Sequence, residues 1–241
     1  MTEAEFLTST DPTALLSFVC DGTDGWRQQH RATRRTLRLF VCACVRQAVP
    51  RPGRHDEEAI RIVEDTKAGE ADGAPVELWK MVSETTYQIG WSGAETAARH
   101  TIRHVLRDHA TTATPAGLAA LLREIVGNPF RPATLPVDEE CKRCKGKGDL
   151  PAGAGGAWVG RPARVGCEKC GGRGGRCSWL TPLVAQMART IYDDRAFGDL
   201  PILADALEDA GCDSEAILMH LRSDGPHVRG CWALDSLLGL C

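Results

Sequence analysis

The sequence has no apolar run that approaches the roughly 20 residues needed to cross a bilayer. Its first residues, Met1 to Phe6, are acidic and lack the basic start and the apolar stretch of a signal peptide. The net charge of −3 is small for 241 residues and gives no overall attraction to nucleic acid or to a membrane surface. These absences predict a cytoplasmic protein with no membrane partner.

Sustained strand alternation is absent as well, and helical spacing dominates the chain. Apolar residues recur three and four positions apart in nearly every periodic segment. The best-marked helix follows Thr114, which suits an N-cap, and Pro115, which suits the first turn; Gly127 suits the residue that ends it. The pattern predicts helices within 37–48, 59–66, 76–89, 98–109, 115–126, 182–191, 201–210, 214–221 and 233–238.

The helical pattern stops between residues 131 and 178, where glycine and proline become dense. We therefore divide the chain into an N-terminal helical part (1–136), a cysteine segment (137–178) and C-terminal helices (179–241) that we expect to pack on the N-terminal part. No fixed-period internal repeat is found.

Eleven cysteines are many for this length, and four of them form two matching motifs. Two residues between paired cysteines let both sulfurs reach one ion, and two such pairs are typical of a four-cysteine zinc site. Glycines after each pair, Gly146 and Gly172, can adopt the positive φ of a tight turn. The motifs, which we call the first and second knuckle, are Cys141-Lys-Arg-Cys144-Lys-Gly146-Lys-Gly148 and Cys167-Glu-Lys-Cys170-Gly-Gly172-Arg-Gly174.

One structural Zn²⁺ bound by Cys141, Cys144, Cys167 and Cys170 is the expected cofactor. Four cysteine ligands leave no open position for water, so the metal would be structural rather than catalytic. A disulfide framework fits poorly, because there is no export signal and the cysteine count is odd. Cys177 is a spare thiol beside the site and an alternative ligand. The expected fold is an all-α, multi-helix globular domain with an inserted irregular or β-knuckle zinc motif of four cysteines.

Three interpretations of the cysteine segment stay open: a staple for a long loop, a surface for a peptide or protein, or a nucleic-acid contact. Between residues 141 and 177, nine Lys and Arg face two acidic residues, which favours nucleic acid. The charge of the thiolates and the presence of a single tryptophan there oppose it. The candidate binding surface consists of Lys145, Lys147, Trp158, Arg173 and Arg176.

The knuckles resemble the cysteine-rich zinc region of DnaJ-type chaperones, with two repeats where that region has four. The resemblance covers residues 141–174 and implies a metal and polypeptide binding; no His-Pro-Asp tripeptide supports a J-domain.

Four further stretches resemble an uncharacterised helical family of Gemmata-type planctomycetes. In that family, the Asn-Pro-Phe-Arg-Pro stretch leads almost directly to the helix that begins here near Trp179. This second resemblance implies that the cysteine segment is an insertion, and the family implies no activity for this chain. Its stretches are Leu37-Arg-Leu-Phe-Val-Cys-Ala-Cys-Val-Arg46, Gly127-Asn-Pro-Phe-Arg-Pro132, residues 191–212 and Gly225-Pro-His-Val-Arg-Gly-Cys-Trp232.

Two other groups were weighed as sites. His100 and His104 stand four apart, but no Glu follows His100 and arginines flank both, so we interpret them as part of a solvated basic helix face. His227 and Cys231 are a candidate nucleophile pair. The alternative interpretation is a turn that initiates a helix, with Cys231 packed inside. We therefore expect a non-enzymatic, zinc-containing helical adaptor for a protein partner, or alternatively a nucleic-acid-binding accessory protein that uses the basic cysteine segment.

Overall fold

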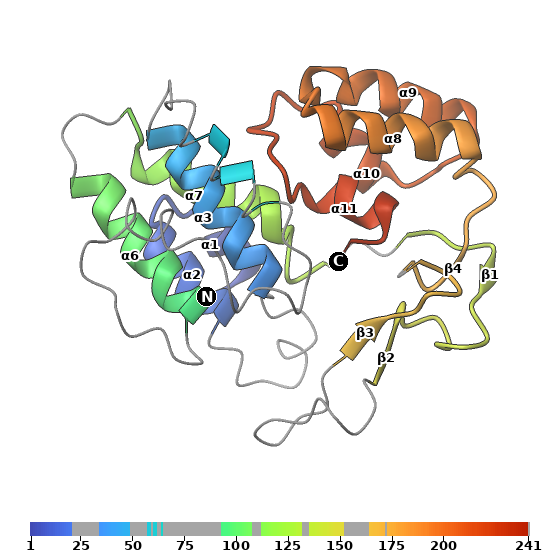
Figure 1. The fold of residues 1–241 in the computed structure, drawn as a ribbon, viewed down its shortest axis with the longest axis horizontal. Coiled ribbons are helices and arrows are strands. Elements are labelled where there is room, and N and C mark those ends of the chain that lie inside the picture. Colours follow the sequence, from blue (N-terminus) through green and yellow to red (C-terminus); the bar gives the residue numbers. More distant parts are fainter. Residues whose placement is uncertain are drawn as a thin grey trace. The chain divides into compact units, whose positions relative to one another are not determined.

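The computed structural model describes residues 1–20, 34–48, 57–58, 60–61, 64, 93–107, 112–131, 135–151, 164–171 and 173–240 of the chain. These residues are predominantly helical (Figure 1), which confirms the all-α expectation. Within this part of the chain, the strands are short and belong to the cysteine segment. No helix among these residues combines the length and apolarity that a bilayer crossing needs. The cytoplasmic location stays a prediction.

The chain forms two compact units. Unit 1 comprises Met1–Pro132 together with Pro226–Gly230, and unit 2 comprises Ala133–Gly225 together with Cys231–Cys241. The cysteine segment therefore lies in the same unit as the helices that follow it. The packing of residues 179–241 on the N-terminal part stays a prediction.

Unit 1 is a helical bundle centred on α3. Its described helices are α1 (Glu3–Thr8), α2 (Pro12–Cys20), α3 (Arg34–Ala48), α6 (Gly93–Arg107) and α7 (Pro115–Val126). Helix α3 contacts both α6 and α7, and α2 contacts the same two helices. The apolar residues at helical spacing along α3, from Leu37 to Val45, are buried. Leu39, Cys42 and Ala43 beside them are buried too, because neighbouring helices cover more than one face of α3.

Helix α7 begins and ends as its sequence predicts. Thr114 Oγ1 accepts a hydrogen bond from the backbone N–H of Gly117 at 3.1 Å, and Pro115 opens the first turn. Gly127 ends the helix with a φ of +73°, although its ψ of −162° lies outside the left-handed helical region. The predicted helix at 76–89 and most of the one at 59–66 lie outside the described residues.

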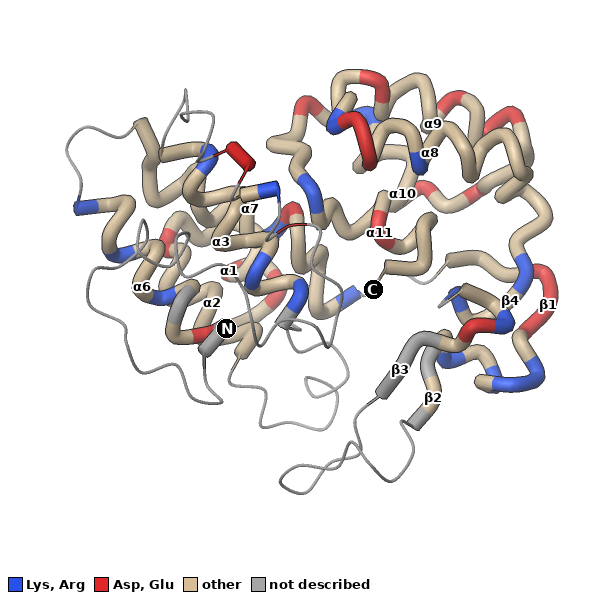
Figure 2. The backbone as a smooth tube through the Cα atoms, in the orientation of Figure 1, with Lys and Arg blue, Asp and Glu red and all other residues tan. Residues whose placement is uncertain are grey.

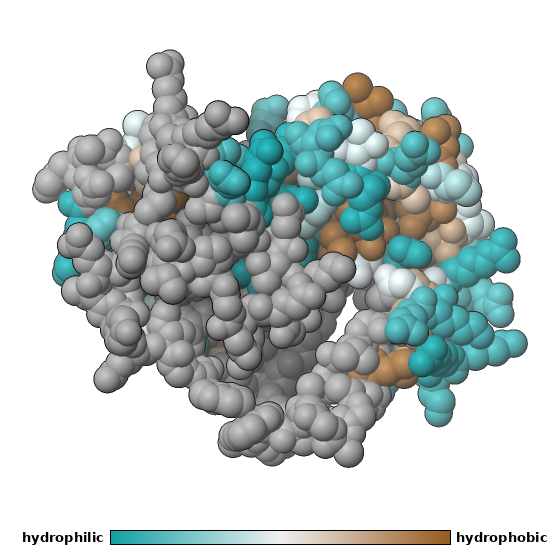
Figure 3. Space-filling view, viewed as in Figure 1, coloured by the Kyte–Doolittle hydropathy of each residue, from teal (hydrophilic) through white to brown (hydrophobic). Residues whose placement is uncertain are grey.

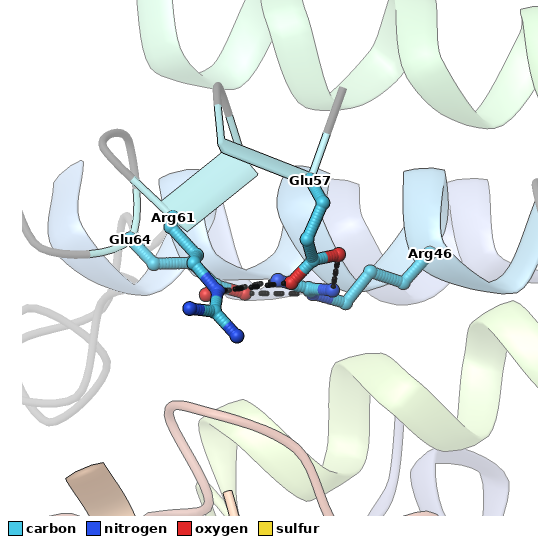
Figure 4. A network of polar contacts seen from close by, with 4 residues as sticks. All are labelled: Arg46, Glu57, Arg61 and Glu64. Carbon is cyan, nitrogen blue, oxygen red and sulfur yellow. Dashed lines mark hydrogen bonds and ion pairs between the residues drawn. The ribbon is translucent and has the colours of Figure 1, made fainter. Parts of the chain in front are cut away.

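An ion-pair network fixes the C-terminal turn of α3 (Figure 4). Arg46 donates to Glu64 from Nε at 3.1 Å and from Nη2 at 3.3 Å, and to Glu57 from Nη1 at 2.6 Å. Arg61 also donates to Glu57, at 3.2 Å. Burial disfavours the charge of Arg46, but its hydrogen bonds with Glu57 and Glu64 outweigh burial and raise its pKa. Arg46 in turn lowers the pKa of Glu57.

The Asn-Pro-Phe-Arg stretch after α7 has a structural role within unit 1. Asn128 accepts from the backbone N–H of Phe130 at 2.9 Å and donates to Glu3 of α1 at 2.8 Å. Arg131 pairs with the same Glu3 at 2.9 Å. The Phe130 ring stacks on Phe18 at 5.3 Å between centroids. This stretch thus fastens the end of α7 to the first two helices.

Residues 226–230 pack into unit 1, although the residues on both sides of them belong to unit 2. His227 Nδ1 lies 3.0 Å from Glu124 Oε1, and both side chains are buried. Gly230 has a φ of +94°, and a Cβ there would lie 2.9 Å from the side chain of Leu39. The glycine is needed at this position both for its backbone conformation and for the close approach to α3.

The described helices of unit 2 are α8 (Pro182–Asp194), α9 (Leu200–Asp209), α10 (Glu215–Leu221) and α11 (Trp232–Leu238), with a 3₁₀ turn, η2 (Phe197–Asp199), before α9. All four helices fall where the sequence predicts them, within a few residues at the ends. Thr181 caps α8 by accepting from the backbone N–H of Val184 at 3.3 Å. A shared core, which includes Ile191, Leu203, Leu207 and Leu234, joins the four helices.

Candidate metal centre

Two short antiparallel ladders bracket the knuckles in unit 2. Strand β1 (Glu139–Glu140) pairs with β4 (Gly175–Arg176), and β2 (Asp149–Pro151) pairs with β3 (Arg164–Gly166). The first knuckle runs from β1 to β2 and the second from β3 to β4. Because the outer and inner strands are paired, the start of each knuckle lies beside the end of the other.

Two equivalent backbone hydrogen bonds link the knuckles. Cys141, the first residue of the first knuckle, donates its N–H to the carbonyl of Gly174 at 2.8 Å. Cys167, the first residue of the second, donates to the carbonyl of Gly148 at 2.7 Å. The first residue of each knuckle therefore bonds to the last glycine of the other knuckle. This approximately two-fold arrangement brings both cysteine pairs together.

The four knuckle sulfurs form one buried group in which all lie within 4.8 Å of one another. Cys141 Sγ lies 3.8 Å from Cys167 Sγ, and Cys144 Sγ lies 3.7 Å from Cys170 Sγ. A tetrahedral ion with metal–sulfur bonds of about 2.3 Å requires sulfurs about 3.8 Å apart. A disulfide would require about 2.0 Å. The spacing therefore suits four ligands around one metal ion.

The local electrostatics of the two turns favour a cation among these sulfurs. Backbone N–H groups of Cys144 and Arg143 point at Cys141 and lower the pKa of its thiol to about 7. Burial raises the pKa of Cys144 to about 11, although the N–H of Gly148 donates to its sulfur at 3.3 Å. The turns thus stabilise one thiolate readily, whereas holding four together requires a positive ion.

Glycines make the close approach of the two knuckles feasible. Gly146 has the predicted positive φ, at +77°, whereas Gly172 lies outside the described residues. Gly174 has a φ of +82°, and a Cβ there would lie 2.3 Å from the carbonyl oxygen of Gly146. Lys145 also has a positive φ, +50°, which its residue type does not predict.

The cysteine segment is tied to the helical core of unit 2 in two places, through Trp179 and through the second knuckle. Trp179 Nε1 donates to the carbonyl of Pro136 at 3.1 Å, next to the start of β1. On the second knuckle, Arg173 Nη1 donates to the carbonyl of Leu237 in α11 at 3.5 Å. Gly239 follows α11, and a Cβ there would lie 1.6 Å from the carbonyl oxygen of Gly171. The end of α11 is therefore in direct contact with the second knuckle.

The structure places the sequence-predicted binding residues in two different settings. Lys145, Lys147 and Arg176 are exposed, whereas Arg173 is half-buried against α11. Trp158 lies outside the described residues. Lys142, Arg143 and Lys169 are exposed too, so the described surface of the knuckles is basic and hydrophilic (Figures 2 and 3).

Cys177, the alternative ligand, does not belong to the group of four sulfurs. It is half-buried, and burial raises the pKa of its thiol. Of the histidine pair on α6, His100 is half-buried and His104 exposed, and Arg103 and Arg107 beside them are exposed. Among the described residues, neither histidine belongs to a group of three or more ligand-bearing side chains.

Cys231 has a neighbour that the sequence did not indicate. Within unit 2 its sulfur lies 3.2 Å from His220 Nε2, and the His220 ring packs on Trp232 at 4.7 Å between centroids. Cys231 is fully buried and precedes the first residue of α11, in agreement with a packed, helix-initiating turn. No motif spacing connects His220 to Cys231, because the contact arises from the packing of α10 on α11.

Comparison of the chain with family models, with curated proteins and with solved structures finds no match. The two resemblances noted in the sequence therefore stay predictions, and the support for the candidate metal centre comes from its own geometry.

Proposed function

We propose that the protein is a non-enzymatic helical interaction module in which one structural Zn²⁺ holds a basic binding surface for a protein partner. The observation that carries the proposal is the buried group of four sulfurs at tetrahedral spacing, directly beneath exposed lysines and arginines of the same two turns. Zinc is favoured because two CxxC pairs are its usual structural ligands. Iron bound by four thiolates has similar geometry, and metal analysis separates the two.

A structural role for the metal is supported by the closure of the site. All four ligand positions are supplied by buried cysteines, so no position is left for water or substrate. The backbone N–H groups around Cys141 and Cys144 serve as ligand-stabilising dipoles. The metal would then fix the shape of the basic surface and take no part in a reaction.

A protein partner is favoured over nucleic acid by the make-up of the described knuckle surface. The described residues of the two knuckles include no aromatic side chain on which a base could stack. Exposed Asp138, Glu139 and Glu140 adjoin the knuckles and interrupt the continuous positive surface along which a phosphate backbone would bind. Mixed charge of this kind suits a polypeptide that offers carboxylates at defined positions.

The proposal predicts that the amount of a protein partner that cross-links to the purified metal-loaded chain depends on the lysines and arginines of the knuckles. We expect replacement of Lys142, Arg143, Lys147 and Lys169 by glutamine to remove most of the partner. Arg103→Gln/Arg107→Gln is the control, because both arginines are exposed on α6 of unit 1. Mass spectrometry of the cross-linked species provides the measurement. Equal recovery with both variants, or recovery that nuclease treatment abolishes, would contradict a protein-binding role of the knuckles.

A further inference from the structure

An open cavity of about 660 Å³ lies in unit 2 beside the candidate metal centre. One wall consists of β1, β4 and the two knuckles, and the other consists of the residues that lead into α8. The volume lies within the range of about 300–1,000 Å³ that is typical of ligand-binding clefts. We call this cavity the knuckle groove; its lining includes Lys142, Lys169, Arg173, Arg176, Leu180 and Pro182.

The charges in the knuckle groove do not cancel evenly. Glu139 also lines it, but it lies directly opposite Arg176 in the β1–β4 ladder, so these two charges offset each other. Glu140 lines the groove as well, and its carboxyl group reaches over the first knuckle, since a Cβ on Gly146 would lie 3.4 Å from it; the four cations of the lining still outnumber these two acidic residues. Lys142 and Lys169 remain as exposed cations, one from each knuckle, and neither makes an ion pair with a described residue.

The opposite wall of the knuckle groove is partly apolar. Leu180 is half-buried on the edge of the unit 2 core, and Pro182 is exposed in the first turn of α8. The N-terminal end of this 13-residue helix adds a weak positive field to the same wall. A ligand in the groove would therefore meet lysines on one side and apolar atoms on the other.

We infer that the knuckle groove binds an acidic, extended segment of the protein partner, with its carboxylates at Lys142 and Lys169 and an apolar side chain against Leu180 and Pro182. This inference rests on the proposed function and specifies the chemistry of its partner. The two knuckles each supply one lysine, so the groove has its binding shape only while the metal holds the knuckles together.

A binding titration with matched variants tests the inference. The probe is a short labelled peptide of alternating glutamate and leucine, followed by fluorescence anisotropy on the full metal-loaded chain. We expect Lys142→Gln/Lys169→Gln to weaken binding about tenfold, the effect of losing two exposed ion pairs. Arg103→Gln/Arg107→Gln removes the same charge from exposed positions on α6 of unit 1, outside the knuckles and the groove, and it should change binding less than about twofold.

Specific outcomes would overturn the inference. Equal weakening by both variant pairs would mean diffuse attraction of the peptide to positive charge, which would remove the groove while leaving the cross-linking test of the proposed function intact. Undetectable peptide binding, or equal binding of a peptide with glutamine in place of glutamate, would remove the acidic ligand. Tighter binding of single-stranded DNA, with the same dependence on Lys142 and Lys169, would overturn the groove ligand and the proposed function together. Metal content of every variant confirms that the knuckles remain folded.

Discussion

Replacement of Cys141 by serine is expected to release the metal and unfold the knuckles while most of the helical signal of the chain remains. Structural zinc contributes about 10–16 kcal/mol of binding free energy in small zinc-dependent domains. Little apolar packing holds the knuckles together, because the ladders are two or three residues long and, within the part of the chain that the structure describes, Leu150 is the apolar side chain packed on the cysteines. Helices α8 to α11 have their own core.

Circular dichroism and metal analysis of the same sample measure this effect. Cys177→Ser is the matched control, because Cys177 follows β4 and lies outside the group of four sulfurs. Hydrogen exchange should also increase at the end of α11, where Arg173 and Gly171 contact Leu237 and Gly239. Cooperative loss of the whole helical signal would contradict the expectation and show that the metal organises the core of unit 2.

Replacement of Gly174 by alanine is expected to weaken metal binding by about 10–100-fold, although it removes no ligand. The new Cβ would lie 2.3 Å from the carbonyl oxygen of Gly146, which is backbone and cannot swing away. Relief of this clash must separate the two knuckles and lengthen the hydrogen bond from Cys141 to Gly174. The positive φ at Gly174 adds about 1–2 kcal/mol of strain.

Gly211→Ala separates the steric effect from the strain. Gly211 also has a positive φ, +96°, but an added Cβ would meet no atom within 4 Å. We expect this variant to lower stability by about 1–2 kcal/mol without a change in metal affinity. Chelator competition measures the affinity of both variants. Equal metal affinity in the two would show that contact between Gly174 and Gly146 does not hold the knuckles together.

Local signals in the sequence predicted the described helices and the four cysteines that come together. Thr114 and Gly127 mark the ends of α7 because caps and positive φ angles are properties of single residues. The group of four cysteines was predictable for the same reason, since each CxxC pair is a local arrangement around its own turn. The two knuckles share the same spacing of cysteines and glycines, and this similarity indicated that their cysteines would meet at one site.

Contacts between distant residues were not predictable from these signals. The nesting of β1–β4 around β2–β3 depends on which strands pair, and strands of two or three residues carry no readable alternation. Arg173 was assigned to the binding surface because it is charged, whereas the structure places it against Leu237. The contact between His220 and Cys231 likewise depends on helix packing.

Metal analysis combined with X-ray absorption spectroscopy of the full chain, purified under reducing conditions, tests the central claim most directly. The proposed function predicts about one zinc per chain with four sulfur ligands at about 2.3 Å. A metal-free protein with four titratable knuckle thiols, disulfides within the knuckles, or iron in place of zinc would contradict the account.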